Sequence, residues 1–165
     1  MPWNNGPVRL YHGCDALAAR AMQTHGIDLT RCRPRTDFGR GFYTTTSEYQ
    51  AKQWANQRAR RNPQNAAKSV AIVIRFDVDR DGLAALQDLV FVMDGPDFYA
   101  LASYCRTGSM PLHGRARPYD VVYGPVSLWQ QRLVIKDCDQ ISFHTPEALD
   151  VLSSPQLHAQ GNPYF

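Results

Sequence analysis

The order of strand-like and helix-like segments is the feature that most constrains the fold of this chain. Short β-prone runs occur at 8–12, 41–45, 69–76, 119–123 and 140–144, with helical patterns between some of them but no regular strand–helix–strand rhythm. A doubly wound parallel sheet requires that rhythm, whereas an α+β fold does not. We therefore expect an α+β fold, and we find no internal repeat.

Two helices carry their own start and stop signals. Asp15 precedes an Ala-rich run that stops before Gly26, which predicts a capped helix between these two residues. Ser47, followed three residues later by Gln50, forms a capping box. This pattern predicts a second helix that ends in a basic run before Pro63.

The remaining segments give weaker local signals. Apolar residues recur at helical spacing over 97–106 and stop at Gly108, whereas 27–40 shows no periodicity and is interpreted as an exposed loop. Another short element is expected within 83–93. Pro146 begins a last short helix to about residue 152. The tail, residues 153–165, is rich in Pro, Gln and Gly, and we expect it to fray.

Length and composition fit one domain, placed at residues 1–152. The 165 residues, 44% of them hydrophobic and 20% charged, are enough to bury a core without a metal or disulfide. No signal peptide and no membrane-spanning run is found, so we expect a soluble, cytoplasmic protein with no membrane partner. The four cysteines are far apart and no metal-ligand spacing occurs, so no metal is expected. A net charge of +3 does not by itself indicate a nucleic-acid partner.

Two segments place a His and a Tyr at the ends of predicted strands. The first is Leu10–Gly13, with His12 beside Gly13, and the second is Asp37–Tyr43, in which Tyr43 follows a Gly-Arg-Gly turn. Glycine lets a backbone approach a ligand closely, and an aromatic ring offers a stacking surface. Taken singly, such a His is more often structural, such a turn is common, and such a Tyr is more often in the core. Together they indicate a nucleotide-binding site.

These segments resemble a bacterial family of the ADP-ribosyltransferase superfamily. The similarity is to the branch that includes diphtheria toxin and poly(ADP-ribose) polymerase, which carries a His, Tyr and Glu triad, and it covers roughly residues 8–152. Its motifs are Leu10–Gly13, Asp37–Thr45, Gln50–Ala51 with Trp54–Ala55, Tyr119–Val126 and Gln140–Thr145.

The resemblance implies a split antiparallel β-core with flanking helices and an NAD cleft, with NAD as the substrate. It implies that His12 bonds a ribose hydroxyl, that the Gly13 backbone holds the nicotinamide carboxamide and that Tyr43 stacks on the nicotinamide ring. The residues it assigns to NAD binding are Tyr11, His12, Gly13, Phe38, Gly39, Arg40, Gly41 and Tyr43.

The third triad position departs from the family pattern. The two glutamates, Glu48 and Glu147, lie at predicted helix starts, and Gln140 is the best match to the strand position of the triad Glu. The transition state for loss of nicotinamide has oxocarbenium character, which a nearby carboxylate stabilises. A Gln can bond a ribose hydroxyl, but it supplies neither charge nor a base. The predicted catalytic residues are His12, Tyr43 and Gln140; Asp139 is an alternative carboxylate that points to the opposite strand face.

Several charged residues remain open to two interpretations. Asp37 lines the nucleotide or forms the turn, and Arg40 lies near the pyrophosphate or is solvated. The basic segments 31–35 and 58–61 meet an acidic or nucleic-acid target or, as charge runs more often do, form solvated faces.

The function that the resemblance implies is mono-ADP-ribosylation of an intracellular macromolecule, either protein or nucleic acid. A compact chain of this kind also fits a bacterial toxin that an antitoxin or immunity protein holds in check. Two alternatives stay open, namely an NAD glycohydrolase, in which water replaces the acceptor, and a non-catalytic module that binds NAD or ADP-ribose.

Overall fold

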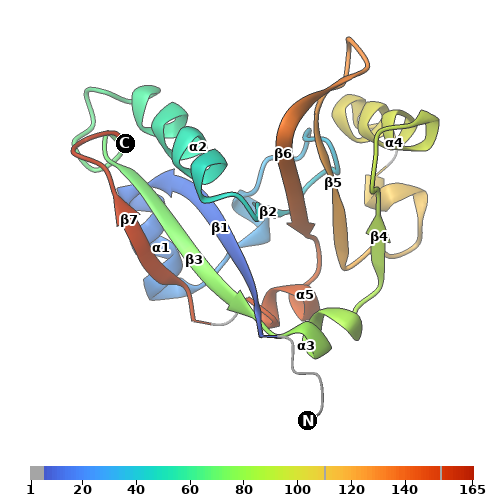
Figure 1. The fold of residues 1–165 in the computed structure, drawn as a ribbon, viewed down its shortest axis with the longest axis horizontal. Coiled ribbons are helices and arrows are strands. Elements are labelled where there is room, and N and C mark those ends of the chain that lie inside the picture. The colour runs from blue at the N-terminus through green and yellow to red at the C-terminus, as the bar shows by residue number, and fades with distance from the viewer. Residues whose placement is uncertain (1–5, 110, 153) are drawn as a thin grey trace. The chain divides into compact units, whose positions relative to one another are not determined.

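The computed structural model describes residues 6–109, 111–152 and 154–165, and over these the chain is α+β, as predicted. It contains two mostly antiparallel sheets and, in the described residues, five α-helices (Figure 1). The chain forms two compact units. Of the described residues, the first unit comprises those in 6–27, 44–85 and 150–165, and the second comprises those in 28–43 and 86–149.

The first unit has a three-stranded antiparallel sheet. Its strands are β1 (Val8–Asp15), β3 (Ala71–Val78) and β7 (Gln156–Gln160), with β3 in the middle. Helix α2 (Glu48–Arg60) packs across β1 and β3 (Figure 1). Small side chains on both elements permit this close packing. The buried cluster between them consists of Tyr11, Ala51, Ala55, Ala59, Ala71 and Val73.

The predicted helix caps are present. The Asp15 carboxylate accepts a hydrogen bond from the Ala18 backbone N at 2.9 Å, which starts α1 (Ala16–His25). Gly26 ends that helix with a φ of 78°, a left-handed value that favours glycine. Ser47 accepts from the Gln50 backbone N at 3.2 Å and so starts α2.

The C-terminal tail is ordered, so the expectation that it frays is wrong for its described residues, 154–165. Strand β7 pairs with β3, and the backbone of Phe165 exchanges two hydrogen bonds with the buried Asn56 side chain on α2. The reason is that β3 needs a partner on its second edge, and the tail supplies the backbone donors and acceptors. Residue 153, where the tail was predicted to begin, lies outside the described residues.

The second unit is built around a four-stranded sheet. Strands β2 (Phe42–Thr44), β6 (Leu133–Phe143), β5 (Val121–Leu128) and β4 (Asp88–Val90) neighbour one another in that order. The β5–β6 pair is antiparallel, and β4 runs parallel to β5. Thr44, the last residue of β2, belongs to the first unit by its contacts.

Helix α4 (Pro96–Thr107) supplies most of the helical core of the second unit. Pro96 occupies its first turn. Gly108, where the sequence predicted that the helix stops, ends it in the left-handed conformation. Its buried face joins a cluster of Phe38, Phe98, Tyr99 and Val122.

Short elements complete the two units. They are α3 (Arg80–Ala84) in the first unit, and in the second the 3-10 turns Leu29–Arg31 and Pro111–Gly114 and most of α5 (Pro146–Asp150). None of the helices in the described residues has both the length and the apolar character that a membrane span requires.

Candidate functional site

The prediction of an exposed loop over 27–40 is wrong at Asp37 and Phe38, which begin the Asp37–Gly41 turn and are buried. Asp37 is 1% exposed and Phe38 is 0% exposed. The Phe38 ring lies among the rings of Tyr43, Phe91 and Phe98, with centroid distances of 6.1 to 6.4 Å. The turn is therefore anchored in the core of the second unit, and the Phe38 side chain is used for packing.

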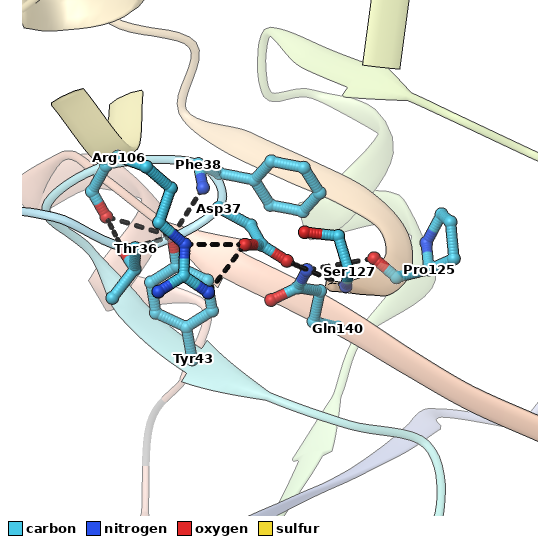
Figure 2. A network of polar contacts seen from close by, with 9 residues as sticks. Thr36, Asp37, Phe38, Tyr43, Arg106, Pro125, Ser127 and Gln140 are labelled. Carbon is cyan, nitrogen blue, oxygen red and sulfur yellow. Dashed lines mark hydrogen bonds and ion pairs between the residues drawn. The ribbon is translucent and has the colours of Figure 1, made fainter. Parts of the chain in front are cut away.

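Asp37 accepts three hydrogen bonds and makes a further ion-pair contact with Arg106, and together these satisfy its buried charge (Figure 2). Arg106 contacts Oδ1 through Nε at 2.8 Å and through a terminal nitrogen at 2.7 Å. Oδ2 accepts from the Ser127 backbone N at 2.9 Å and from Gln140 Nε2 at 2.7 Å. A buried carboxylate is tolerated only with such a set of donors. Of the two interpretations of Asp37, the structure favours the one in which it forms the turn.

The Tyr43 hydroxyl is held by the same turn. It accepts from the Phe38 backbone N at 2.9 Å, donates to the Gly39 carbonyl at 2.9 Å and lies 2.7 Å from Thr36 Oγ1 (Figure 2). Burial raises the pKa of Tyr43, so the phenol stays protonated. The residue keeps part of its surface exposed. Its geometry suits a fixed ring that offers a stacking face, not a general base.

Gln140 lies on β6, the strand next to β2, and is 4% exposed. Its Nε2 donates to Asp37 Oδ2 at 2.7 Å and to the Pro125 carbonyl at 2.9 Å. The same turn therefore fixes both Tyr43 and Gln140, the two predicted catalytic residues that lie in the second unit. Asp139, the alternative carboxylate, precedes Gln140 on the same strand, paired with Pro125 of β5.

Two buried histidines hold the carbonyls of this turn. His113 Nε2 donates to the Phe38 carbonyl and His144 Nδ1 donates to the Arg40 carbonyl, each at 2.8 Å. Burial, with His113 beside it, lowers the pKa of His144 to about 3, and burial also lowers the pKa of His113. Both imidazoles are neutral near pH 7 and act as structural hydrogen-bonding groups.

The glycines and the arginine of the turn have separate roles. Gly39 has a φ of 78°, which favours glycine, and a Cβ on Gly41 would lie 2.7 Å from the His144 ring. Arg40 is exposed, and its guanidinium donates to the Thr30 and Cys32 carbonyls. Arg40 thus has hydrogen-bond partners in its own loop, and its predicted contact with a pyrophosphate stays a prediction.

The first unit carries the Leu10–Gly13 motif on β1. Tyr11 is buried in the α2 interface, with its ring 5.1 Å from that of His158, whereas His12 keeps part of its surface exposed. A Cβ on Gly13 would lie 2.1 Å from the Ala51 carbonyl oxygen. Packing is therefore by itself a sufficient reason for glycine at this position. The predicted NAD contacts of these residues stay predictions.

No group of three His, Cys, Asp or Glu side chains that could hold a metal occurs among the described residues. The four cysteines are unpaired thiols. Burial, together with Asp37, raises the pKa of Cys105 to about 11, so this thiol beside the turn is a poor nucleophile.

Comparison with known families finds a match over most of the chain. The family described as "Protein of unknown function (DUF3990)" matches residues 8–137, most of the chain. The chain belongs to the DUF3990 family. The matched region of this family member includes His12, the Asp37–Gly41 turn and Tyr43, and it ends before Gln140. No protein with a curated description matches the chain.

Sequence reasoning missed Arg106, Ser127 and the two histidines as parts of the site. Arg106 and Ser127 reach Asp37 across 69 and 90 positions of the chain, and His113 reaches Phe38 across 75. No local pattern marks such partners. The available signal was chemical: an acid beside a Phe in a Gly-rich turn needs donors if the turn is buried.

Proposed function

We propose that this chain is an NAD-dependent mono-ADP-ribosyltransferase that acts on a macromolecule inside the cell, with an ADP-ribosyltransferase-like fold. The observation that carries the proposal is the shared anchoring of Tyr43 and Gln140 by one buried turn. Pre-organisation of this kind is what a site needs when it must hold a leaving ring and a ribose in fixed positions. The two mostly antiparallel sheets are compatible with the split β-core of that superfamily.

In the proposed reaction, the bond between nicotinamide and its ribose breaks, and nicotinamide leaves with the electron pair. Tyr43 stacks on the nicotinamide ring. The anchored hydroxyl of Tyr43 keeps the Tyr43 ring in one orientation. Gln140 accepts a hydrogen bond from a ribose hydroxyl through its amide oxygen, and His12 also bonds a ribose hydroxyl. The acceptor then forms the new bond at the sugar carbon and loses its proton to water.

Arg106 and the two histidines act indirectly in this proposal. They hold Asp37 and the carbonyls of the turn, so that Tyr43 does not have to be ordered when NAD binds. Because both histidines are used in hydrogen bonds and are neutral, neither serves as the acid or base of the reaction.

The test is nicotinamide release from NAD by the purified chain. We expect a His12→Ala, Tyr43→Ala double variant to release nicotinamide more than about 100-fold more slowly than the wild type, because it loses both a ribose contact and the stacking face. A His25→Ala, Tyr49→Ala double variant, at two exposed positions, is the matched control and should keep the wild-type rate. Equal rates in the two double variants would contradict the assignment of the site.

Labelled NAD then identifies the class of acceptor. We expect the ADP-ribose label on protein or nucleic acid of a bacterial lysate, and a growth defect on expression that a cognate antitoxin or immunity protein relieves. Free ADP-ribose as the product would instead identify an NAD glycohydrolase.

A non-catalytic module that binds NAD or ADP-ribose is the second candidate. One observation favours it: position 140 holds a neutral amide, whose nitrogen is already bonded twice. NAD binding measured by calorimetry, together with no nicotinamide release in the presence of lysate, would identify this function.

A further inference from the structure

The contacts of Gln140 determine which atom of its amide faces which way. Asp37 Oδ2 and the Pro125 carbonyl oxygen lie 2.7 and 2.9 Å from the same amide atom, and both already function as acceptors. Only the NH2 group can donate to two acceptors, so this atom is Nε2. Oε1 therefore faces away from Asp37 and Pro125 (Figure 2).

We propose that Asp37 is a positioning residue, which fixes Gln140 so that position 140 presents a neutral amide oxygen to the substrate. The proposal rests on the function proposed above. The negative charge is buried at position 37, and the group that meets the ribose hydroxyl is uncharged.

A carboxylate at position 140 does not fit beside Asp37. One of its oxygens would take the place of Nε2, within hydrogen-bonding distance of two acceptors and without a proton to donate. Arg106 does not relieve this conflict, because its Nε and terminal nitrogen both contact Oδ1, on the other side of the Asp37 carboxylate. Two carboxylates that share a buried site repel each other.

The charges of the cluster support the same conclusion. The positive charge of Arg106 balances the negative charge of Asp37, and Gln140, which is neutral, leaves the net charge of the cluster unchanged. A Gln140→Glu substitution alone adds an unmatched negative charge, and Asp37→Asn alone leaves Arg106 unmatched. The combination of both restores the balance, and an Asn amide at position 37 offers a donor to the carboxylate at 140.

The experiment compares four full-length proteins: the wild type, Asp37→Asn, Gln140→Glu and the double variant. We expect both single variants to unfold at lower urea concentrations than the wild type. The double variant should lose less than the sum of the two single losses. Gln50 is also 4% exposed but lies in the first unit, so Gln50→Glu combined with Asp37→Asn is the matched control and should be additive. Additive losses in the 37 and 140 pair would overturn the proposal.

The pH profile of nicotinamide release shows what position 140 presents to the substrate. In the double variant a carboxylate replaces the amide oxygen at position 140. The rate of release should therefore fall at acid pH, where this carboxylate is protonated, and this acid limb should be absent from the profiles of the wild type and Asp37→Asn. We also expect release at least about tenfold faster than that of Gln140→Glu. If the losses of stability at positions 37 and 140 are not additive but the double variant shows no acid limb, the substrate-facing role of Gln140 is overturned. No release by any of the four proteins would overturn the proposed transferase function, and the stability coupling alone would then decide whether Asp37 fixes Gln140.

Discussion

His113 and His144 meet edge to face, with ring centroids 4.6 Å apart and planes at 90°. Each donates one hydrogen bond to a carbonyl of the Asp37–Gly41 turn and uses its second nitrogen in another contact, with the Tyr119 backbone N or with Ser142 Oγ. A proton added to His113 Nδ1 would face the Tyr119 backbone N–H without an acceptor, and a positive charge on either ring would be buried. The pair therefore couples the conformation of the turn to pH.

We expect the chain to lose stability as the pH falls from about 6.5 toward 3. In the unfolded chain a histidine binds a proton below about pH 6.5. The pKa of His144 is lowered to about 3 in the folded state, so the unfolded state binds more protons between these values and acid favours it. Between pH 7.5 and 5.0 this loss is about 2 kcal/mol from His144. The lowered pKa of His113 acts in the same direction.

Urea unfolding at several pH values measures this effect. A His144→Gln variant should be less stable than the wild type at pH 7.5, yet its stability should fall less between pH 7.5 and 5.0. His25→Gln, at the exposed end of α1, is the matched control. An identical pH slope in the wild type and the His144 variant would show that this imidazole is not held neutral.

Arg106 should be essential for the stability of the second unit. An Arg106→Met substitution keeps most of the side-chain length but leaves the Asp37 charge buried with two fewer donors. The free energy of unfolding should fall by about 3 to 5 kcal/mol. Arg31→Met, in which the exposed ion pair with Asp28 is lost, should leave stability unchanged within error. Similar losses in the two variants would contradict the buried-charge argument.

The difference between local and distant signals explains how much of this structure the sequence predicted. The caps at Asp15, Ser47 and Gly108 were predicted because each depends on residues within four positions. The burial of Asp37 and the order of the tail were not predicted, because their partners lie 69 to 109 positions away. The same limit applies to the site: its motifs named Tyr43 and Gln140, but only the fold shows that one turn holds both.

Gly13 should tolerate no side chain, whatever its part in NAD binding. A Cβ would lie 2.1 Å from the Ala51 carbonyl oxygen and 2.7 Å from the Ala55 backbone N, and these α2 backbone atoms cannot move independently. Gly13→Ala should therefore cost about 3 kcal/mol of unfolding free energy by overpacking. Gly6→Ala, where nothing lies within 4 Å, is the control. A Gly13→Ala protein as stable as the wild type would mean that β1 and α2 are not this close, and loss of activity could then be assigned to NAD binding.

The tail should contribute measurable stability to the first unit through Asn56. Its side chain donates to the Phe165 carbonyl at 3.2 Å and accepts from the Phe165 backbone N at 2.9 Å, and it is buried. Asn56→Ala should lower the free energy of unfolding by about 1 to 3 kcal/mol, because it removes both bonds and leaves backbone groups unpaired.

Deletion of 161–165 should lower the free energy of unfolding by at least as much. The two changes combined should cost less than the sum of the two separate losses, since they remove the same contacts. Gln57→Ala, at the exposed neighbouring position, is the control. Fully additive losses from Asn56→Ala and the deletion would show that the tail is held by other contacts, such as the 2.8 Å bond from the Ala71 backbone N to the Pro163 carbonyl.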